Sequence, residues 1–135
     1  MVKELVFSTK KKRELINITS EIQKVLAESK VAEGICLVFV PHATAALLLN
    51  EDEEGFKADV ETLLENWMPE GDWEHNRIDN NATAHLASAF IGQSKAVPIV
   101  GGRLQLGTWQ EIFLVELDGP RGSRRVIVKI IQNKQ

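Results

Sequence analysis

The fold class is decided by the stretch Thr108-Trp109-Gln110-Glu111-Ile112-Phe113-Leu114-Val115-Glu116-Leu117. Branched and aromatic residues are frequent in it, a composition that favours a β-strand. Apolar side chains fall on both faces of this strand, Ile112 and Leu114 on one and Phe113 and Val115 on the other. Since neither face suits contact with water, we expect other elements of the chain, and in part another subunit, to cover it.

Further strands are predicted before and after this stretch. A second strong strand covers Arg124 to Gln132 and follows the turn-like composition Asp118-Gly119-Pro120-Arg121-Gly122. Ile35 to Val40 is a continuous apolar run, which is typical of a strand buried on both faces. Ala45 to Leu49 is predicted to be an apolar strand, and Ser94 to Val100, which contains a proline, an edge strand.

The N-terminal part of the sequence holds two short segments of alternating apolar residues, Val2 to Thr9 and Glu14 to Ile18. They predict a β-hairpin whose turn is the basic run Lys10-Lys11-Lys12-Arg13. Aromatic stacking platforms are absent around this run, and the formal net charge of the chain is −3. We therefore interpret the run as a solvated turn and expect no nucleic acid among the partners.

Three segments have helical patterns. Ser20 and Gln23 resemble a capping box, and an apolar stripe of about three turns follows them. The acidic cluster Asp52-Glu53-Glu54 suits the start of a second helix, whose apolar face extends to Trp67. Thr83 to Phe90 predicts a short third helix.

The segment Met68 to Asn81 between the last two helices is polar and lacks a period, so we expect a long functional loop. Together the elements predict an α+β fold with a mostly antiparallel or mixed β-sheet and two to three helices. The length of 135 residues fits a single compact domain, residues 1–135, without separate cofactor and substrate domains.

The composition is that of a soluble globular protein, with 44% hydrophobic and 26% charged residues. No apolar stretch approaches the roughly 20 residues that a membrane-spanning helix needs, so we expect no membrane partner. An export signal is not visible at the start. The lone cysteine, Cys36, is predicted to be buried and cannot form an internal disulfide, which suits a cytoplasmic protein.

The chain has three histidines, His42, His75 and His85, and each is flanked by turn-forming, small or acidic residues. Imidazole is the commonest transition-metal ligand, and three histidines with a fourth position left open are typical of a catalytic zinc site. The hypothesis is a three-histidine centre for a divalent, zinc-like metal. Because the spacing matches no compact zinc signature, it requires convergence in the fold. The alternative is that each histidine has an ordinary structural role.

Other polar residues could complete such a site. Asn80, with Asp79, is a candidate to orient a histidine ring and to contact a substrate, and Glu51 and Glu116 are candidate acid–base groups. Solvated carboxylates are the alternative for both glutamates. A nucleophilic mechanism has no good candidate, because Cys36 lies in an apolar strand and no Gly-x-Ser-x-Gly sequence is present.

The segment Gly101 to Gln110 gathers three glycines, Arg103, Thr108 and Gln110. Glycines allow close approach of a ligand to the backbone, and the guanidinium of arginine suits phosphate. We therefore predict that Arg103, Thr108 and Gln110 contact a phosphorylated small molecule. The alternative is an ordinary β-turn before a strand, and the segment lacks the Gly-Lys-Ser/Thr ending of a nucleotide-binding P-loop.

One set of motifs spans nearly the whole chain: His42-Ala43-Thr44-Ala45-Ala46-Leu47, Asn50-Glu51, His75, Asn81-Ala82-Thr83-Ala84-His85-Leu86, Gly102-Arg103 and Gly107-Thr108-Trp109-Gln110. Together they resemble the YjbQ-like family, also called the secondary thiamine-phosphate synthase family. The resemblance implies a compact α+β subunit that assembles as a homotrimer, with a pocket of histidines and acids near a subunit boundary. Ala43 departs from the threonine or serine common in the family after the histidine.

The resemblance also implies an activity, the joining of a hydroxymethylpyrimidine diphosphate to a thiazole phosphate with loss of pyrophosphate. Loss of a diphosphate usually involves magnesium, so magnesium is a possible metal beside the zinc-like ion that histidines favour. The first hypothesis is thus a metal-dependent enzyme resembling secondary thiamine-phosphate synthase. The alternatives are a non-catalytic trimer that binds a small anion or a protein partner, and a metal-dependent phosphoester hydrolase.

Overall fold

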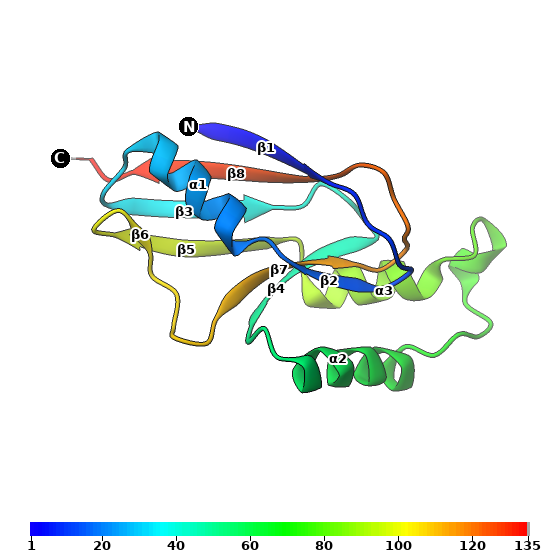
Figure 1. Cartoon of the computed structure of the whole chain (residues 1–135). Coiled ribbons are helices and arrows are strands. Elements are labelled where there is room, and N and C mark those ends of the chain that lie inside the picture. The colour runs from blue at the N-terminus through cyan, green and yellow to red at the C-terminus, as the bar shows by residue number, and fades with distance from the viewer. Residues whose placement is uncertain (135) are drawn as a thin grey trace.

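The structure is a computed structural model that describes residues 1–134. Within these residues the chain forms two antiparallel sheets, three α-helices and one short 3-10 helix (Figure 1). The five-stranded sheet has the order β1 (Val2–Phe7), β8 (Arg124–Gln132), β3 (Gly34–Phe39), β5 (Ser94–Val100) and β6 (Arg103–Leu104). The three-stranded sheet has the order β2 (Glu14–Asn17), β7 (Glu111–Glu116) and β4 (Ala45–Asn50). The helices are α1 (Thr19–Ser29), α2 (Glu54–Trp67), η1 (Glu74–Arg77) and α3 (Ala82–Ile91).

The expected α+β fold is confirmed, and β7 is buried on both faces, as its composition predicts. It lies between β2 and β4 in the smaller sheet, and every residue after Glu111 in this strand is buried. The edge position of β5 is nearly as predicted, since only the two-residue strand β6 lies beyond it. The loop after β7 then carries the chain into the larger sheet, where β8 pairs with both β1 and β3.

The predicted N-terminal hairpin is wrong. β1 pairs with β8, with Val2 opposite Lys129, whereas β2 pairs with β7, with Glu14 opposite Glu116. The two segments therefore belong to different sheets. Alternation of apolar residues identifies a strand and its inner face, but it carries no information about the partner strand. The basic run is the connection between the two sheets.

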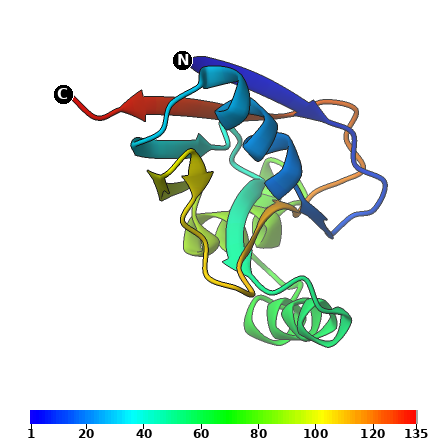
Figure 2. The same cartoon turned by 60° about the vertical axis from the view of Figure 1, so that its left-hand side comes forward.

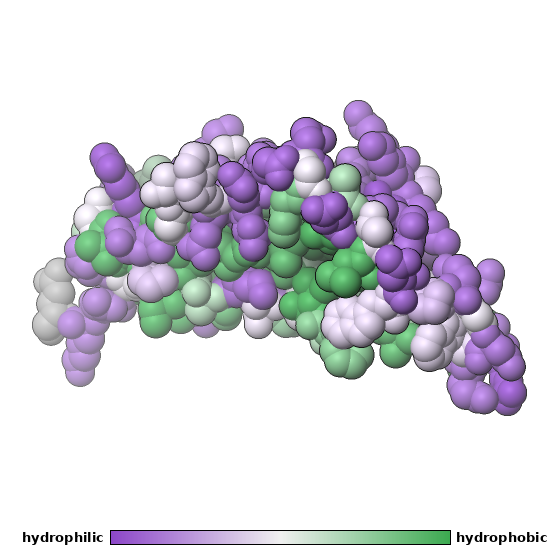
Figure 3. Space-filling view, turned by 90° about the horizontal axis from the view of Figure 1, so that it is seen from below, coloured by the Kyte–Doolittle hydropathy of each residue, from purple (hydrophilic) through white to green (hydrophobic). Residues whose placement is uncertain are grey.

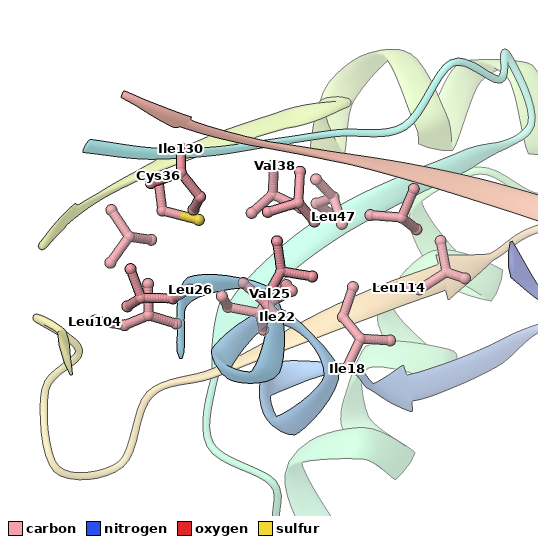
Figure 4. Packing of buried hydrophobic residues seen from close by; sticks show 14 of the residues in the cluster. Ile18, Ile22, Val25, Leu26, Cys36, Val38, Leu47, Leu104, Leu114 and Ile130 are labelled. Carbon is pink, nitrogen blue, oxygen red and sulfur yellow. The ribbon is translucent and has the colours of Figure 1, made fainter. Parts of the chain in front are cut away.

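The main core lies between the larger sheet and α1. The helix turns Ile22, Val25 and Leu26 into this core, where Figure 4 shows them facing the sheet residues Val38 and Ile130. These five side chains are at most 3% exposed. Their burial is the dominant favourable term for holding α1 against the sheet.

Two helix starts differ in how they are capped. Ser20, the predicted cap of α1, lies inside the helix, and Asn17 accepts the hydrogen bond from the Thr19 N–H at 3.0 Å instead. At α2 the acidic start is confirmed, because the Glu53 carboxylate accepts hydrogen bonds from two N–H groups of the first turn. A carboxylate there is favoured by both the free N–H groups and the helix dipole.

The helix α2 lies below α3 (Figures 1 and 2), and its residue Leu64 belongs to a buried cluster with Ala46 of β4 and Val115 of β7. Of the residues described in α2, only Leu64 is buried, and Leu63 and Trp67 are exposed. In the view from below, hydrophobic side chains reach the surface in this part of the molecule (Figure 3). Ion pairs from Arg13 to Glu61 and Glu65 also tie the helix to the connection between β1 and β2.

The outer face of the larger sheet carries apolar residues that none of the helices in residues 1–134 covers. Ile35 and Phe39 of β3 and Ile131 of β8 lie on it and are 46%, 40% and 46% exposed. Ile35 and Ile131 are direct cross-strand partners. The prediction that the run from Ile35 to Val40 is buried on both faces therefore fails for the single chain, since its buried residues Cys36, Val38 and Val40 alternate with partly or fully exposed ones.

Candidate functional site

Three connections and one helix start meet at the same end of the molecule (Figure 1). They are the connections 8–13, 40–44 and 117–123, together with the start of α3 and the neighbouring η1. The polar residues gathered beside the start of α3 are called here the histidine cluster. The cluster consists of His75, Asn81, His85, Asp118 and Arg121.

The cluster is organised by a chain of hydrogen bonds. Nε2 of His75 lies 2.9 Å from Oδ1 of Asn81, and Nδ2 of Asn81 donates to Oδ2 of Asp118 at 2.8 Å. Nη2 of Arg121 donates to the same Asp118 oxygen at 2.9 Å. The ring of His85 packs against that of His75, with centroids 4.2 Å apart.

This chain fixes the tautomer of His75. An ionised carboxylate only accepts hydrogen bonds, so the NH₂ group of Asn81 faces Asp118 and its carbonyl oxygen faces the ring. Nε2 of His75 must then carry the proton. In the neutral ring Nδ1 is left with a lone pair, the form in which an imidazole accepts a proton.

Asn81 occupies the N-cap position of α3, yet within residues 1–134 its side chain caps no N–H group of that helix. Its amide is engaged by His75 and Asp118 instead. The first N–H group of the helix, that of Ala82, donates to Oδ1 of Asn76 at 2.9 Å. The local preference of asparagine for capping has therefore given way to contacts from η1 and from the loop after β7.

His42 lies in the connection between β3 and β4 and has a different partner. Its Nε2 accepts a hydrogen bond from the backbone N–H of Arg125 at 2.9 Å, so Nδ1 carries the proton in the neutral ring. Burial lowers the pKa of His42, and the positive charges of Arg124 and Arg125 lower it further. The ring is consequently a neutral donor through Nδ1 near pH 7.

The predicted three-histidine metal centre is wrong. Among the described residues, 1–134, no group of three or more histidine, cysteine or acidic side chains is placed to hold a metal ion. His75 and His85 do lie together, but Nε2 of His75 is bonded to Asn81 and Nε2 of His42 to the backbone of β8. The rings use these nitrogens for hydrogen bonds within the protein.

Glu116, one of the two predicted acid–base residues, is fully buried at the end of β7. Its carboxylate pairs with Arg124, which is 4% exposed, and accepts hydrogen bonds from Thr9 and from backbone N–H groups. Burial alone would raise the pKa of Glu116, but the hydrogen bonds from Arg124 and Thr9 give a net decrease. The group is a buried carboxylate in the native state at neutral pH.

The remaining predicted residues lie away from the histidine cluster or at its margin. Thr108 and Gln110 line an open groove beside the start of α1, and Gln110 folds back to accept a hydrogen bond from the Gly107 N–H at 2.8 Å. Arg103 is exposed in β6. Glu51 follows the end of β4 that pairs with Glu111.

Asn80 is exposed beside the cluster, and its N–H donates to Asp79. The groove and the cluster lie at opposite ends of β7, which at about 3.3 Å per residue are roughly 17 Å apart. One subunit therefore does not bring the predicted substrate residues to the histidines.

Sequence reasoning missed the roles of Asn81, Asp118 and Arg121. Asn81 has the composition signal of a helix cap, and Asp118 and Arg121 belong to a segment with turn composition. A usable signal was the pair of opposite charges at i and i+3 within that turn, Asp118 and Arg121, which the structure shows as an ion pair of 2.9 Å. None of the helices described in residues 1–134 has the length and apolar character needed to cross a bilayer.

Comparison with known proteins places the chain among relatives. The family model of the UPF0047, YjbQ-like proteins matches residues 3–133. A UPF0047 protein of Methanothermobacter thermautotrophicus is 44% identical over 128 residues, which cover 94% of this chain and 89% of the relative. One of Archaeoglobus fulgidus is 44% identical over 129 residues, covering 95% and 99%. A crystal structure from Sulfolobus solfataricus P2 has a TM-score of 0.96 at 41% identity and covers 98% of this chain and 97% of its own.

These relatives correct the functional prediction. The Sulfolobus protein is described as YbjQ-like and of unknown function, and the archaeal relatives carry only the UPF0047 name. The hypothesis of a metal-dependent enzyme resembling secondary thiamine-phosphate synthase thus has neither its metal centre nor support from the relatives. The family resemblance itself is confirmed over nearly the whole chain, and the protein belongs to the UPF0047, YjbQ-like family.

Proposed function

We propose that the protein is an acid–base enzyme that transfers a proton to or from a small anionic molecule, with His75 as the proton-accepting group. The single observation that carries this proposal is the Asp118–Asn81–His75 chain, which sets the tautomer of the ring. A residue that orients a catalytic imidazole through its other nitrogen is a recurrent device in proton transfer. His85, whose ring packs against that of His75 at a tilt, is the candidate for a second proton carrier.

The ligand that we propose is anionic, and a phosphorylated small molecule is the first class to test. Arg121 offers an exposed guanidinium at the cluster, and exposed Asn80 is a further contact at its margin. Neutral His42 adds an N–H donor at the same end of the molecule. Planar guanidinium and neutral N–H groups suit phosphate oxygens without requiring a protonated histidine.

We also propose that the protein works as a homotrimer in the cytoplasm. The uncovered apolar outer face of the larger sheet supports self-association, because such faces on a single subunit mark interaction sites. The separation of the groove from the histidine cluster supports it as well. A neighbouring copy could bring Thr108, Gln110 and Arg103 to the cluster, completing a site at the boundary between subunits.

The test of the enzyme proposal uses imidazole NMR and a substrate panel. Long-range ¹H–¹⁵N spectra of the labelled protein should show His75 as the Nε2–H tautomer, and inorganic phosphate should shift its signals and those of His85 but not those of Asn133. Turnover is then sought by incubating small phosphate esters in D₂O and following loss of C–H signals. His75→Gln should slow any turnover by about 100-fold or more. An Nδ1–H tautomer at His75, or signals unmoved by phosphate, would overturn the proposal.

The oligomer has its own measurement. Light scattering coupled to size exclusion should give three times the 15.1 kDa mass of the chain. A monomer at micromolar concentration contradicts the homotrimer and leaves the histidine chain to be judged by the NMR experiment.

A further inference from the structure

Glu116 and Arg124 form a buried ion pair where the chain passes from the smaller to the larger sheet. Nε of Arg124 donates to both carboxylate oxygens at 2.9 and 3.1 Å. Such a pair is expensive to desolvate, and replacing it by apolar residues is often neutral or favourable for stability. Its presence beside the histidine cluster therefore calls for a reason besides stability.

The pair contacts each of the connections that border the site. Oε1 of Glu116 accepts from the Thr9 hydroxyl at 2.7 Å, in the connection 8–13. Oε2 accepts from the backbone N–H of Asp118 at 3.1 Å. Nη2 of Arg124 donates to the carbonyl and the hydroxyl of Thr44 at 3.0 and 2.9 Å, two residues from His42. One ion pair thus ties three connections together.

The path from this pair to His75 is continuous. Thr9 exchanges two hydrogen bonds of 2.8 Å with Arg121, one from its own N–H to the Arg121 carbonyl and one from the Arg121 N–H to its hydroxyl. Arg121 donates a hydrogen bond to the side chain of Asp118, and the Glu116 carboxylate accepts one from the backbone N–H of Asp118. Asp118 fixes the amide of Asn81, which fixes the ring.

The path to His42 is shorter. The N–H that His42 accepts belongs to Arg125, the residue directly after Arg124 in β8. Arg124 also anchors Thr44 at the other side of the His42 connection. Displacement of the arginine would therefore move both the donor to the His42 ring and the backbone that carries the ring.

We propose that Glu116 and Arg124 are positioning residues, whose buried pair holds His42 as its Nδ1–H tautomer and His75 as its Nε2–H tautomer. The inference rests on the proposed function for the importance of the site, and it replaces the predicted proton-handling role of Glu116. The carboxylate has no exposed surface and both of its oxygens accept hydrogen bonds from the protein. It acts on a ligand only through the two imidazoles.

The test measures tautomers and amide exchange in Glu116→Gln and Arg124→Lys, with Val128→Ala as the control. Val128 is fully buried in β8, so its truncation lowers stability without removing a member of the network. In both network variants His42 should populate both tautomers, and the Arg125 N–H should exchange at least about tenfold faster relative to the control. The control should keep the native tautomers.

Native tautomers and unchanged Arg125 exchange in both network variants would overturn the inference, as would equal changes in Val128→Ala. If neither network variant folds, Thr9→Val decides, because it removes one hydroxyl that holds both Glu116 and Arg121. A mixed tautomer at His75 in this variant supports the inference, and a native one overturns it. The tautomer and exchange measurements need no substrate. If the wild-type tautomers are as stated but phosphate shifts no histidine signal, the proposed function is overturned and the positioning role of Glu116 and Arg124 is not.

Discussion

Replacement of Asn81 tests the central geometric claim about the histidine cluster. Asn81→Ala removes the hydrogen bond to His75 and the bond to the Asp118 carboxylate. A neutral hydrogen bond contributes about 0.5–1.5 kcal/mol and one to a charged group about 1.5–3 kcal/mol. Because the residue is only half-buried and water can replace part of both bonds, we expect the free energy of unfolding to fall by about 1–3 kcal/mol.

The matched control is Asn81→Ser, which separates this role from helix capping. Serine is as good an N-cap as asparagine, but its short hydroxyl cannot bridge His75 and Asp118. We therefore expect the serine variant to lose nearly as much stability as the alanine variant. Urea unfolding followed by tryptophan fluorescence, at one fixed protein concentration, gives both values. Wild-type stability in Asn81→Ser would show that capping of α3 is the real role and would refute the reasoning.

Three other predictions follow from burial and charge. The pKa of His42 in the folded protein lies below its ordinary value of 6.5, so the unfolded chain takes up a proton more readily than the folded one. The free energy of unfolding should therefore fall as pH decreases below about 6.5. Urea titrations between pH 7.5 and 5.5 should show this slope in the wild type and a flatter one in His42→Gln. Burial raises the pKa of Cys36 to about 11, so an aromatic disulfide reagent at pH 8 should label it only at the rate of unfolding; rapid labelling of native protein would contradict its burial. Phe39→Lys with Ile131→Lys should shift the proposed homotrimer to monomers in sedimentation equilibrium, whereas a trimeric mass unchanged by both substitutions would place the subunit interface elsewhere.

Local patterns were sufficient to predict the elements. The apolar runs that became β3, β4 and β8 were identified within one residue, and β7 within three residues at its start, because β-branched side chains and turn residues mark strands and their ends. The acidic start of α2 was predicted for the same kind of reason, since Glu53 meets N–H groups only two and three residues away.

Pairing was not predictable from the same patterns. The segments that form β1 and β2 have the spacing of a hairpin. However, β1 pairs with β8, more than a hundred residues later in the sequence, and β2 pairs with β7, about a hundred residues later. Their inner faces match the cores of two different sheets, and this match is a property of the assembled chain. The apolar outer residues of β3 raise the same point, because the run from Ile35 to Val40 predicts burial on both faces, yet Ile35 and Phe39 are exposed in the described residues 1–134.

The site was harder still, because its residues have alternative local uses. Glu53 and Asn81 both occupy N-cap positions, but only Glu53 caps its helix in the described structure. Glu53 is exposed and its carboxylate finds its nearest donors in its own first turn. Asn81 lies between His75 and the carboxylate of Asp118, a charged acceptor 37 residues away that binds its NH₂ group. The side chain takes the stronger, charge-assisted partner that the fold supplies, so the orientation of His75 depends on a residue that sequence rules assign to a turn.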